Sequence, residues 1–426
     1  MRYLIFLFTI IYTFNSFSLN IEDSVKSTIE NNINIKIALE EINESKELIE
    51  TSLSNYKPDL SITLSEKQIS TETTTSTSSS TTNKLQDSYS FTVKQNLYRG
   101  GRNQLELEKS KILFNKQLET FYSTINDLIL RAIDGYLTVQ LYNKSLIAIE
   151  KNFEVVEQIY LDTLNSKELG VSTLVDLKKA ESSYEKAKSN LILAKSNLEV
   201  GNKTFKNIVG LDAFDLKSII KVNKNISSNE VLNNALKNNH NLKILNLDYE
   251  ASKLDLEINK RNKYPTFDLT GNATYNDNVS SKGTETTSGS LEVTLSIPIF
   301  QKGIENSNIR KFKSKSIQAD YKTVDQKELI ELNSIILVNN YNVFKSQIES
   351  TLSSIEANEV TLDLIEKEYE LGLRVFSDVL DQEQKLLDAS LENFNRNKDF
   401  LITYFEILSL EGKLIDEFKE YLPQIN

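Results

Sequence analysis

The chain has 426 residues, a formal net charge of −11 and no cysteine. Hydrophobic residues make up 39% of it and charged residues 26%, which excludes a disordered chain and a helical membrane protein. The acidic balance argues against nucleic-acid binding. The absence of cysteine excludes a disulfide framework and a thiolate metal site. Only 12 Gly and 4 Pro interrupt the chain, which favours long helices.

The first 18 residues, "MRYLIFLFTIIYTFNSFS", predict a secretory signal peptide (1–18). Arg2 is followed by an apolar run that ends near Phe14, and Ser16 and Ser18 stand at the spacing that a signal peptidase reads. The run is too short for a spanning helix. We therefore expect an exported protein, with cleavage after Ser18.

The rest of the chain contains an internal duplication. Its glycines recur at an offset of 202: Gly101, Gly170 and Gly210 return as Gly303, Gly372 and Gly412. Upstream, Pro58 and Pro265 are 207 positions apart, so five extra residues lie between Pro58 and Gly101. That interval holds a Ser/Thr-rich stretch, residues 70–83, which we expect to be a surface loop. The pattern predicts two structural repeats, 19–212 and 230–426, joined by a linker at 213–229.

Each repeat contains a long heptad pattern, which is typical of a coiled coil. The first repeat has two series of apolar or small residues spaced by seven: Leu118, Ile125, Ala132, Val139, Leu146, Phe153 and Tyr160, with Phe121, Leu128, Gly135, Tyr142, Ile149 and Val156. From Gly101 to Gly170, and from Gly303 to Gly372, there are 69 residues, or about 100 Å of helix at 1.5 Å per residue. We predict two long helical hairpins that turn back at Gly170 and Gly372.

Four segments have the two-residue period of strands: 60–65, 88–98, 267–275 and 290–299. One face of each is apolar and the other is polar, which is typical of a membrane β-barrel. Four strands cannot close a barrel, and lipid does not tolerate open sheet edges, so several copies of the chain must contribute strands. Three copies would give twelve. The aromatic residues near the strand ends are candidates for an interfacial girdle: Tyr89, Tyr98, Phe267, Tyr275 and Phe300.

These features together resemble a known family. The strand-to-helix joints "NLYRGG" (96–101) and "PIFQKG" (298–303), and the hairpin tip "YELGLRVFSDVLD" (369–381), are similar to those of TolC-like outer-membrane efflux proteins. The resemblance implies an α+β membrane protein, a homotrimer with a shared twelve-stranded β-barrel in the Gram-negative outer membrane and a long periplasmic α-barrel. It also implies a passive exit duct of a tripartite efflux or type I secretion system. Its partners would be a periplasmic adaptor, an inner-membrane pump or ABC transporter, and outer-membrane lipid.

The resemblance also assigns roles at the periplasmic tip. It implies that Asp378 and Asp381 form acidic gate and selectivity rings in the lumen. It implies that Arg374, Tyr369 and Asp176 form a latch of the closed state. An alternative stays open, because Asp378 and Asp176 fall in the first turn of a return helix, where an acid caps free N–H groups.

The hairpin turns are the expected contacts of the adaptor: Gly170, Val171, Gly372 and Leu373. Leu373 departs from the small polar residue that the resemblance leads us to expect. His240, the only histidine, is expected to have a packing or surface role.

The sequence carries no motif of an enzyme, so we expect no catalytic residue, cofactor or metal site. Two other classes fit long exported helices: a coiled-coil structural protein and a periplasmic adaptor without channel activity. The two amphipathic strand pairs argue against both classes, because neither of them needs a lipid-facing band.

Overall fold

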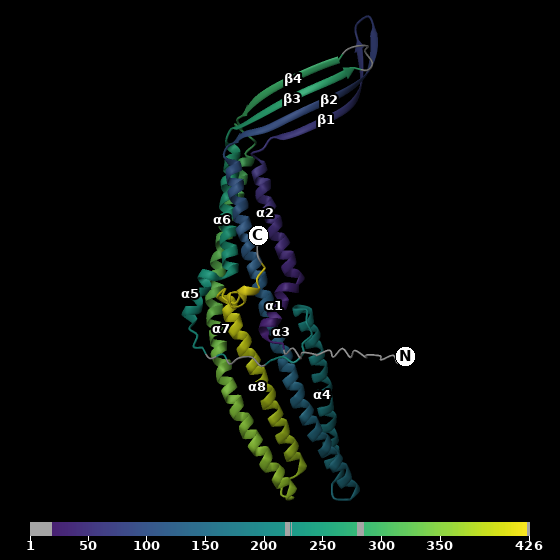
Figure 1. Cartoon of the computed structure of the whole chain (residues 1–426), viewed down its shortest axis with the longest axis vertical. Helices are drawn as coiled ribbons and strands as arrows, with labels where there is room; N and C mark the ends of the chain where they lie inside the picture. Colours follow the sequence, from purple (N-terminus) through teal and green to yellow (C-terminus); the bar gives the residue numbers. More distant parts are fainter. Residues whose placement is uncertain (1–18, 218–221, 223, 279–284, 424–426) are drawn as a thin grey trace, which may run out of the picture. The chain divides into compact units, whose positions relative to one another are not determined.

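The computed structural model describes residues 19–217, 222, 224–278 and 285–423 (Figure 1). The predicted signal peptide lies outside the described residues. The elements in chain order are α1 (Ile21–Asn31), α2 (Ile33–Ser54), β1 (Asp59–Thr74), β2 (Ser79–Arg99), α3 (Arg102–Glu168), α4 (Leu174–Val209), α5 (Ser228–Asn238), α6 (His240–Lys260), η1 (Arg261–Lys263), β3 (Thr266–Asn278), β4 (Glu285–Ser296), α7 (Ile304–Glu370), α8 (Phe376–Leu410) and η2 (Asp416–Tyr421).

The structure reproduces the predicted duplication. Helices α3 and α7 each have 67 residues and begin 202 positions apart. Strands β1 and β3 begin 207 positions apart. The six glycines that defined the repeat all have positive φ angles. Lys302 stands where the first repeat has Gly100, and it adopts the same left-handed region with φ 55°. The backbone conformation is therefore shared by the two repeats even where the residue type is not.

The chain forms two compact units, and each unit combines segments of both repeats. The first comprises residues 1–37, 122–239 and 328–426, and the second comprises residues 38–121 and 240–327. The long helices α3 and α7 each contribute to both units. The compact units thus differ from the sequence repeats predicted at 19–212 and 230–426.

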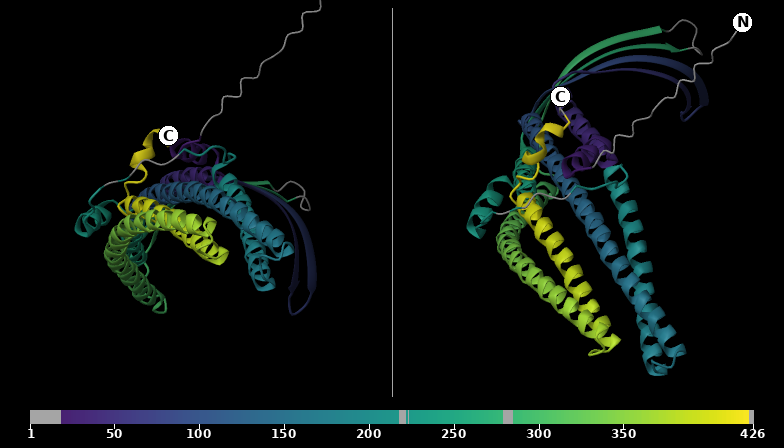
Figure 2. Two further views of the ribbon diagram at one scale, coloured as in Figure 1. Left: turned by 90° about the horizontal axis from the view of Figure 1, so that it is seen from below. Right: turned by 60° about the horizontal axis from the view of Figure 1, so that its bottom comes forward.

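In the first unit, α3 and α4 form one hairpin and α7 and α8 form the other (Figure 2). The predicted heptad seam of α3 is buried here, with Ile125, Ala132 and Val139 fully inaccessible. Helix α4 contributes buried small residues that also recur every seven positions: Ala180, Ala187, Ala194 and Gly201. This pairing of large and small residues lets the two helices approach closely. None of the helices in the described part of the chain has both the length and the apolar character needed to cross a membrane.

The second unit contains an antiparallel sheet in the order β1-β2-β3-β4 (Figure 1). The prediction of a loop over residues 70–83 is wrong, because β1 and β2 continue through this stretch and only residues 75–78 connect them. Threonine favours strands, and the ladder of backbone hydrogen bonds supplies partners that a low-complexity composition does not reveal. The predicted strand at 290–299 ends early, at Ser296. Pro298, which lacks an N–H group to donate, follows this end.

Gly412 supports a test of the packing in the first unit. It has φ +68°, and a Cβ at this position would lie 2.5 Å from the backbone oxygen of Asn238. Gly372 has a similar φ of +74°, with no heavy atom near the Cβ position. Alanine at Gly372 should therefore cost only the left-handed strain, about 1 kcal/mol. Gly412→Ala should lower the midpoint of thermal unfolding, followed by circular dichroism in detergent, clearly more than Gly372→Ala does. Equal midpoints would contradict the tight contact between Gly412 and Asn238.

Candidate functional site

One face of the sheet is apolar and exposed. In the strand register, Leu60 lies opposite Val93, and Gly271 lies between Val93 and Leu291, so all four strands contribute to one row. Ile62 is 73% exposed and Leu291 is 77% exposed. A soluble protein rarely leaves a contiguous apolar face of this extent in water. The exposed apolar side chains of this face are Leu60, Ile62, Leu64, Tyr89, Phe91, Phe267, Leu291, Val293 and Leu295.

The opposite face of the sheet is polar and hydrogen-bonded across strands. Asn272 of β3 accepts hydrogen bonds from Ser90 (2.9 Å) and Thr92 (3.4 Å) of β2. Asn96 of β2 donates to Asp268 of β3 at 2.5 Å. These contacts join polar side chains across strands on the face that points away from the apolar one, although Asn96 Oδ1 has no hydrogen-bond partner within the described residues. The sheet therefore separates an apolar environment from an aqueous one.

Two aromatic pairs bracket the apolar band. Tyr89 and Tyr275 have ring centroids 6.0 Å apart at one end, and Tyr98 and Phe267 have centroids 6.4 Å apart at the other. Phe267 and Tyr275 are eight positions apart on β3, or about 27 Å along the strand. An outward apolar band about 25 Å tall with aromatic girdles at both interfaces is typical of membrane barrels. Four of the five aromatic residues singled out from the sequence thus lie at the band's edges.

A row of carboxylates follows the Tyr89–Tyr275 pair on the same face. The register places Glu66 opposite Asp87, Asp87 opposite Asp277, and Asp277 opposite Glu285. Four acids side by side across four strands require water or headgroups rather than hydrocarbon. This row therefore marks where the apolar band ends and the β1–β2 hairpin continues beyond it.

The tip of the α7–α8 hairpin brings Arg374 and Asp378 together. The Arg374 guanidinium lies 2.7 Å from Glu368 and 3.6 Å from Asp378. The hydrogen bond and charge of Glu368, followed by the charge of Asp378, raise the pKa of Arg374 above its ordinary value. Tyr369, which the family resemblance grouped with Arg374, is 41% exposed at the same tip. The tip of this hairpin is thus an exposed cluster of paired charges.

The tip of the α3–α4 hairpin has a different arrangement. Asp176 and Thr173 form a capping box at the start of α4, and the hydrogen bonds from Thr173 hold the pKa of Asp176 below its ordinary value. The equivalent cap of α8 is Val375, which has no side-chain hydrogen bond to offer. Asp378 is therefore left to pair with Arg374. The helix-cap interpretation thus fits Asp176, and the structure does not place Asp176 in an ion pair with Arg374.

Asp381, one turn beyond Asp378, is exposed and forms no ion pair with the part of the chain that the structure describes. The turn residues are exposed as well: Val171 is 81% exposed and Leu373 is 74% exposed. The predicted gate acids are therefore accessible, but only one of them has a cationic partner within the chain.

Sequence reasoning missed a buried acid, Glu383, just after these aspartates. Its side chain reaches α3, where Asn152 hydrogen-bonds it, and the residue is 9% exposed. Burial, and then the charge of Glu366 on α7, raise the pKa of Glu383, while Lys151 and Asn152 act in the opposite direction. Glu383 does not clearly break the pattern of apolar residues along α8. The sequence therefore gives no signal that distinguishes it from the solvated acids around it.

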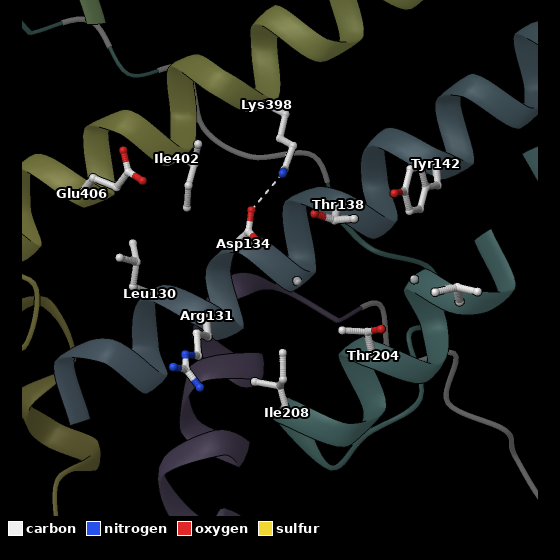
Figure 3. A pocket seen from close by; sticks show the side chains of 13 residues that line it. Leu130, Arg131, Asp134, Thr138, Tyr142, Thr204, Ile208, Lys398, Ile402 and Glu406 are labelled. Atoms are coloured by element: carbon white, nitrogen blue, oxygen red, sulfur yellow. Dashed lines mark ion pairs between the residues drawn. The ribbon is translucent and has the colours of Figure 1, made fainter. Parts of the chain in front are cut away.

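Higher on the same helices, α3, α4 and α8 line a groove of about 630 Å³ (Figure 3). Lys398 of α8 reaches across to Asp134 of α3, with 2.9 Å between Nζ and Oδ1. Burial and the nearby Asp134 raise the pKa of Glu406 on the same wall. The groove therefore has a polar wall on α8, and its ion pair joins the two hairpins.

The lone histidine lies in the second unit. His240 Nδ1 is 2.8 Å from Glu119, which also lies 3.7 Å from Lys243. The contact joins the start of α6 to α3. His240 therefore has a role in packing, as expected.

Comparison with known proteins identifies the family. The sequence profile described as "Outer membrane efflux protein" matches residues 25–211 and 231–412, one segment for each repeat. The chain belongs to the outer membrane efflux protein family, and it is an outer-membrane protein. The predicted resemblance and location are thereby confirmed.

Relatives of known sequence and solved structures support the same family and fold. Outer membrane protein TolC of Escherichia coli (strain K12) is 24% identical over 323 residues, which cover 70% of this chain and 64%, just under two thirds, of TolC. The Campylobacter jejuni CmeC outer membrane channel has a TM-score of 0.82 at 14% identity, covering 95% of this chain and 90% of CmeC. The open state of the Neisseria gonorrhoeae MtrE outer membrane channel has a TM-score of 0.72 at 14% identity, covering 92% of this chain and 89% of MtrE. These similarities confirm the predicted fold of duplicated helical hairpins with a membrane-type sheet.

The buried Glu383 predicts a pH-dependent stability. Because its pKa is raised above 4.5 in the folded state, the native protein binds this proton more tightly than the unfolded chain does. Its contribution to stability is present in full below pH 4.5 and is lost as pH rises through the raised pKa. Glu383→Gln keeps a hydrogen-bond acceptor for Asn152 and removes the titration. The variant should unfold at a higher temperature than wild type at pH 7, and the difference should shrink at pH 4.

A matched control is Glu359→Gln, which changes an exposed acid of α7. It should leave the pH dependence of the unfolding temperature unchanged. If Glu383→Gln behaves like this control, Glu383 is solvated and the buried contact with Asn152 is wrong.

Proposed function

We propose that the chain assembles as a homotrimer that forms the passive exit duct of a tripartite efflux or type I secretion system. The two-faced sheet carries the proposal. Within the described residues, β1 and β4 each pair on one side only, so the sheet presents unpaired peptide groups at both edges. Such edges cannot persist in hydrocarbon. Three copies supply twelve strands, which close into one barrel with the apolar face toward lipid and the polar face toward the lumen.

The helices support the same assembly. At about 100 Å each, α3 and α7 extend far beyond what a single small core requires. Exposed apolar side chains remain on both α4 and α7 in the single chain. In the trimer these helices line a second, periplasmic tube. Neither alternative class, an exported structural coiled coil or an adaptor, accounts for the apolar face of the sheet.

The hairpin tips are the periplasmic end of the duct. Asp378 and Asp381 of three copies form acidic rings there, and rings of Asp favour cations in pores. Arg374, with Tyr369 and Asp176 nearby in the assembled tip, restrains the closed state. The exposed turns at Gly170, Val171, Gly372 and Leu373 contact a periplasmic adaptor, which couples the duct to an inner-membrane pump or ABC transporter. The duct itself performs no catalysis and needs no cofactor.

Native mass spectrometry in detergent, followed by planar-bilayer recording, tests the assembly. The expected result is a threefold mass and discrete, cation-preferring conductance steps. A stable monomer or dimer, or a trimer that never conducts under any voltage, would refute the duct.

The two gate acids should differ in their effect on selectivity. Arg374 partly neutralises Asp378 at 3.6 Å, whereas Asp381 is exposed and unpaired within the described chain. Asp381→Asn should therefore reduce the cation-to-anion permeability ratio more than Asp378→Asn does. Reversal potentials in asymmetric KCl give the ratio, and Asp363→Asn, an exposed change on α7, serves as control. If neither gate variant departs from the control, the lumenal-ring assignment is wrong although the duct would stand.

A further inference from the structure

The groove of about 630 Å³ between α3, α4 and α8 has the size of a small-molecule site. Its wall on α8 carries Lys398, Ile402 and Glu406 (Figure 3). Small residues line the part where α3 meets α4: Gly135, Thr138, Gly201 and Thr204. The three helices therefore leave room for a ligand that their own side chains do not fill.

The groove lies on the face of α3 that the N-terminal segment leaves open. The Tyr136 hydroxyl is 3.0 Å from the carbonyl oxygen of Leu19 and 2.7 Å from that of Lys217, so this face of α3 is covered. Asp134 and Thr138, each two positions away from Tyr136, line the groove. Two positions turn an α-helix by about 200°, which puts the groove on the opposite face. Figure 2 shows α1 on the outer side of the curved helices of the first unit, so the groove opens on their inner side.

Two ion pairs neutralise the bases that α8 contributes near the groove. Lys398 Nζ is 2.9 Å from Oδ1 of Asp134 on α3. The Arg396 guanidinium is 3.0 Å from Oδ2 of Asp399, one turn later on α8. A ligand in the groove therefore meets these two cations with their charges already balanced.

Glu406 is an acid of the groove without a cation of its own. The other base of the lining, Arg131, acts on Asp127 of the same helix, where its charge opposes the rise in pKa that burial causes. Glu406 forms no ion pair within the part of the chain that the structure describes. Burial and the charge of Asp134 raise its pKa, whereas Lys398 acts in the opposite direction. Positive charge from outside the chain would thus stabilise this carboxylate.

Apolar side chains lie around this carboxylate. Leu130 of α3 and Ile402 of α8 are beside Glu406 (Figure 3). Farther along the groove, Val200 of α4 is 62% exposed and Tyr142 of α3 contributes an aromatic ring. Carboxylates and aromatic faces attract cations, and aliphatic side chains favour an apolar body. The lining therefore suits a ligand that combines a positive charge with a large apolar surface.

We propose that this groove binds a lipophilic organic cation, with its charge against Glu406 and its apolar body over Leu130 and Ile402. The proposal rests on the duct described above, in which the inner side of the helices faces the lumen. It adds one binding position to the wall in each copy. Glu406 is 28 positions from Asp378 along α8, or about 42 Å, so this position is separate from the acids of the tip.

Isothermal titration calorimetry of the full-length protein in detergent tests the site. The probes are tetraphenylphosphonium and tetraphenylborate, which share one shape and differ in the sign of their charge. Glu406→Gln removes the negative charge and keeps the size of the side chain. Its matched control is Glu30→Gln, which changes an exposed acid of α1 outside the groove. Thr204→Trp fills the groove from an exposed position on α4.

Wild type and Glu30→Gln should bind tetraphenylphosphonium equally and tetraphenylborate far more weakly. Glu406→Gln should weaken binding of the cation about tenfold, because a half-buried charge contact is lost. Thr204→Trp should abolish binding, and native mass spectrometry should show every variant in the oligomeric state of wild type. Uptake of the probes by micelles cancels, because all samples share one detergent. If either groove variant binds the cation as tightly as the control does, or if tetraphenylborate binds equally well, the site is wrong.

Planar-bilayer recording separates the failure of this site from the failure of the duct. Tetraphenylphosphonium should reduce the conductance of wild type and Glu30→Gln more than that of Glu406→Gln. The acids of the tip are the same in all three proteins, so the difference reports on the groove. Equal block in all three proteins overturns the lumenal site and leaves the duct standing. If wild type neither forms a trimer nor conducts, the duct fails, and the lumenal position of the groove fails with it.

Discussion

The peptide groups at the edges of the sheet constrain the whole molecule. A sheet with one apolar face belongs in hydrocarbon, yet every unpaired N–H and C=O there costs several kcal/mol. Four strands leave edges at β1 and β4, and a single chain of this length offers nothing in its described residues to cover them. In the proposed trimer, copies of the chain meet at these edges. Once strands are shared in this way, the helices that continue from them are also brought side by side.

Although the chain is an internal duplication, the two repeats differ at their hairpin tips. The first repeat starts its return helix with Thr173, whose hydroxyl engages Asp176. The second starts it with Val375, which has no hydroxyl, so Asp378 is available to Arg374. The residue at the cap thus decides whether the acid three positions later hydrogen-bonds the start of the helix or pairs with the charges of the tip. In the proposed duct, this difference places the gate acids in the second repeat.

The helices also differ in how they adhere to one another. Within each hairpin, aromatic contacts such as Tyr136 with Phe205 stand beside polar ones such as Asn393 with Thr351. Between hairpins they are polar, as between Lys398 and Asp134. A net hydrogen bond stabilises by about 1 kcal/mol, whereas burial of a large aromatic contributes more.

The sequence alone determined the duplication, the helical hairpins, the four strands and the family, because these depend on local periods and on glycines that require positive φ. It could not determine the extent of β1 and β2 through residues 70–83, because cross-strand hydrogen bonding leaves no mark in a Ser/Thr-rich composition. It placed Asp378 and Asp381 at the tip but could not tell that Arg374 pairs with Asp378. It did not distinguish Glu383 from solvated acids, because burial depends on which helix comes to lie beside it. Only the packing of α8 on α3 decided that, by removing water from one carboxylate and leaving its neighbours exposed.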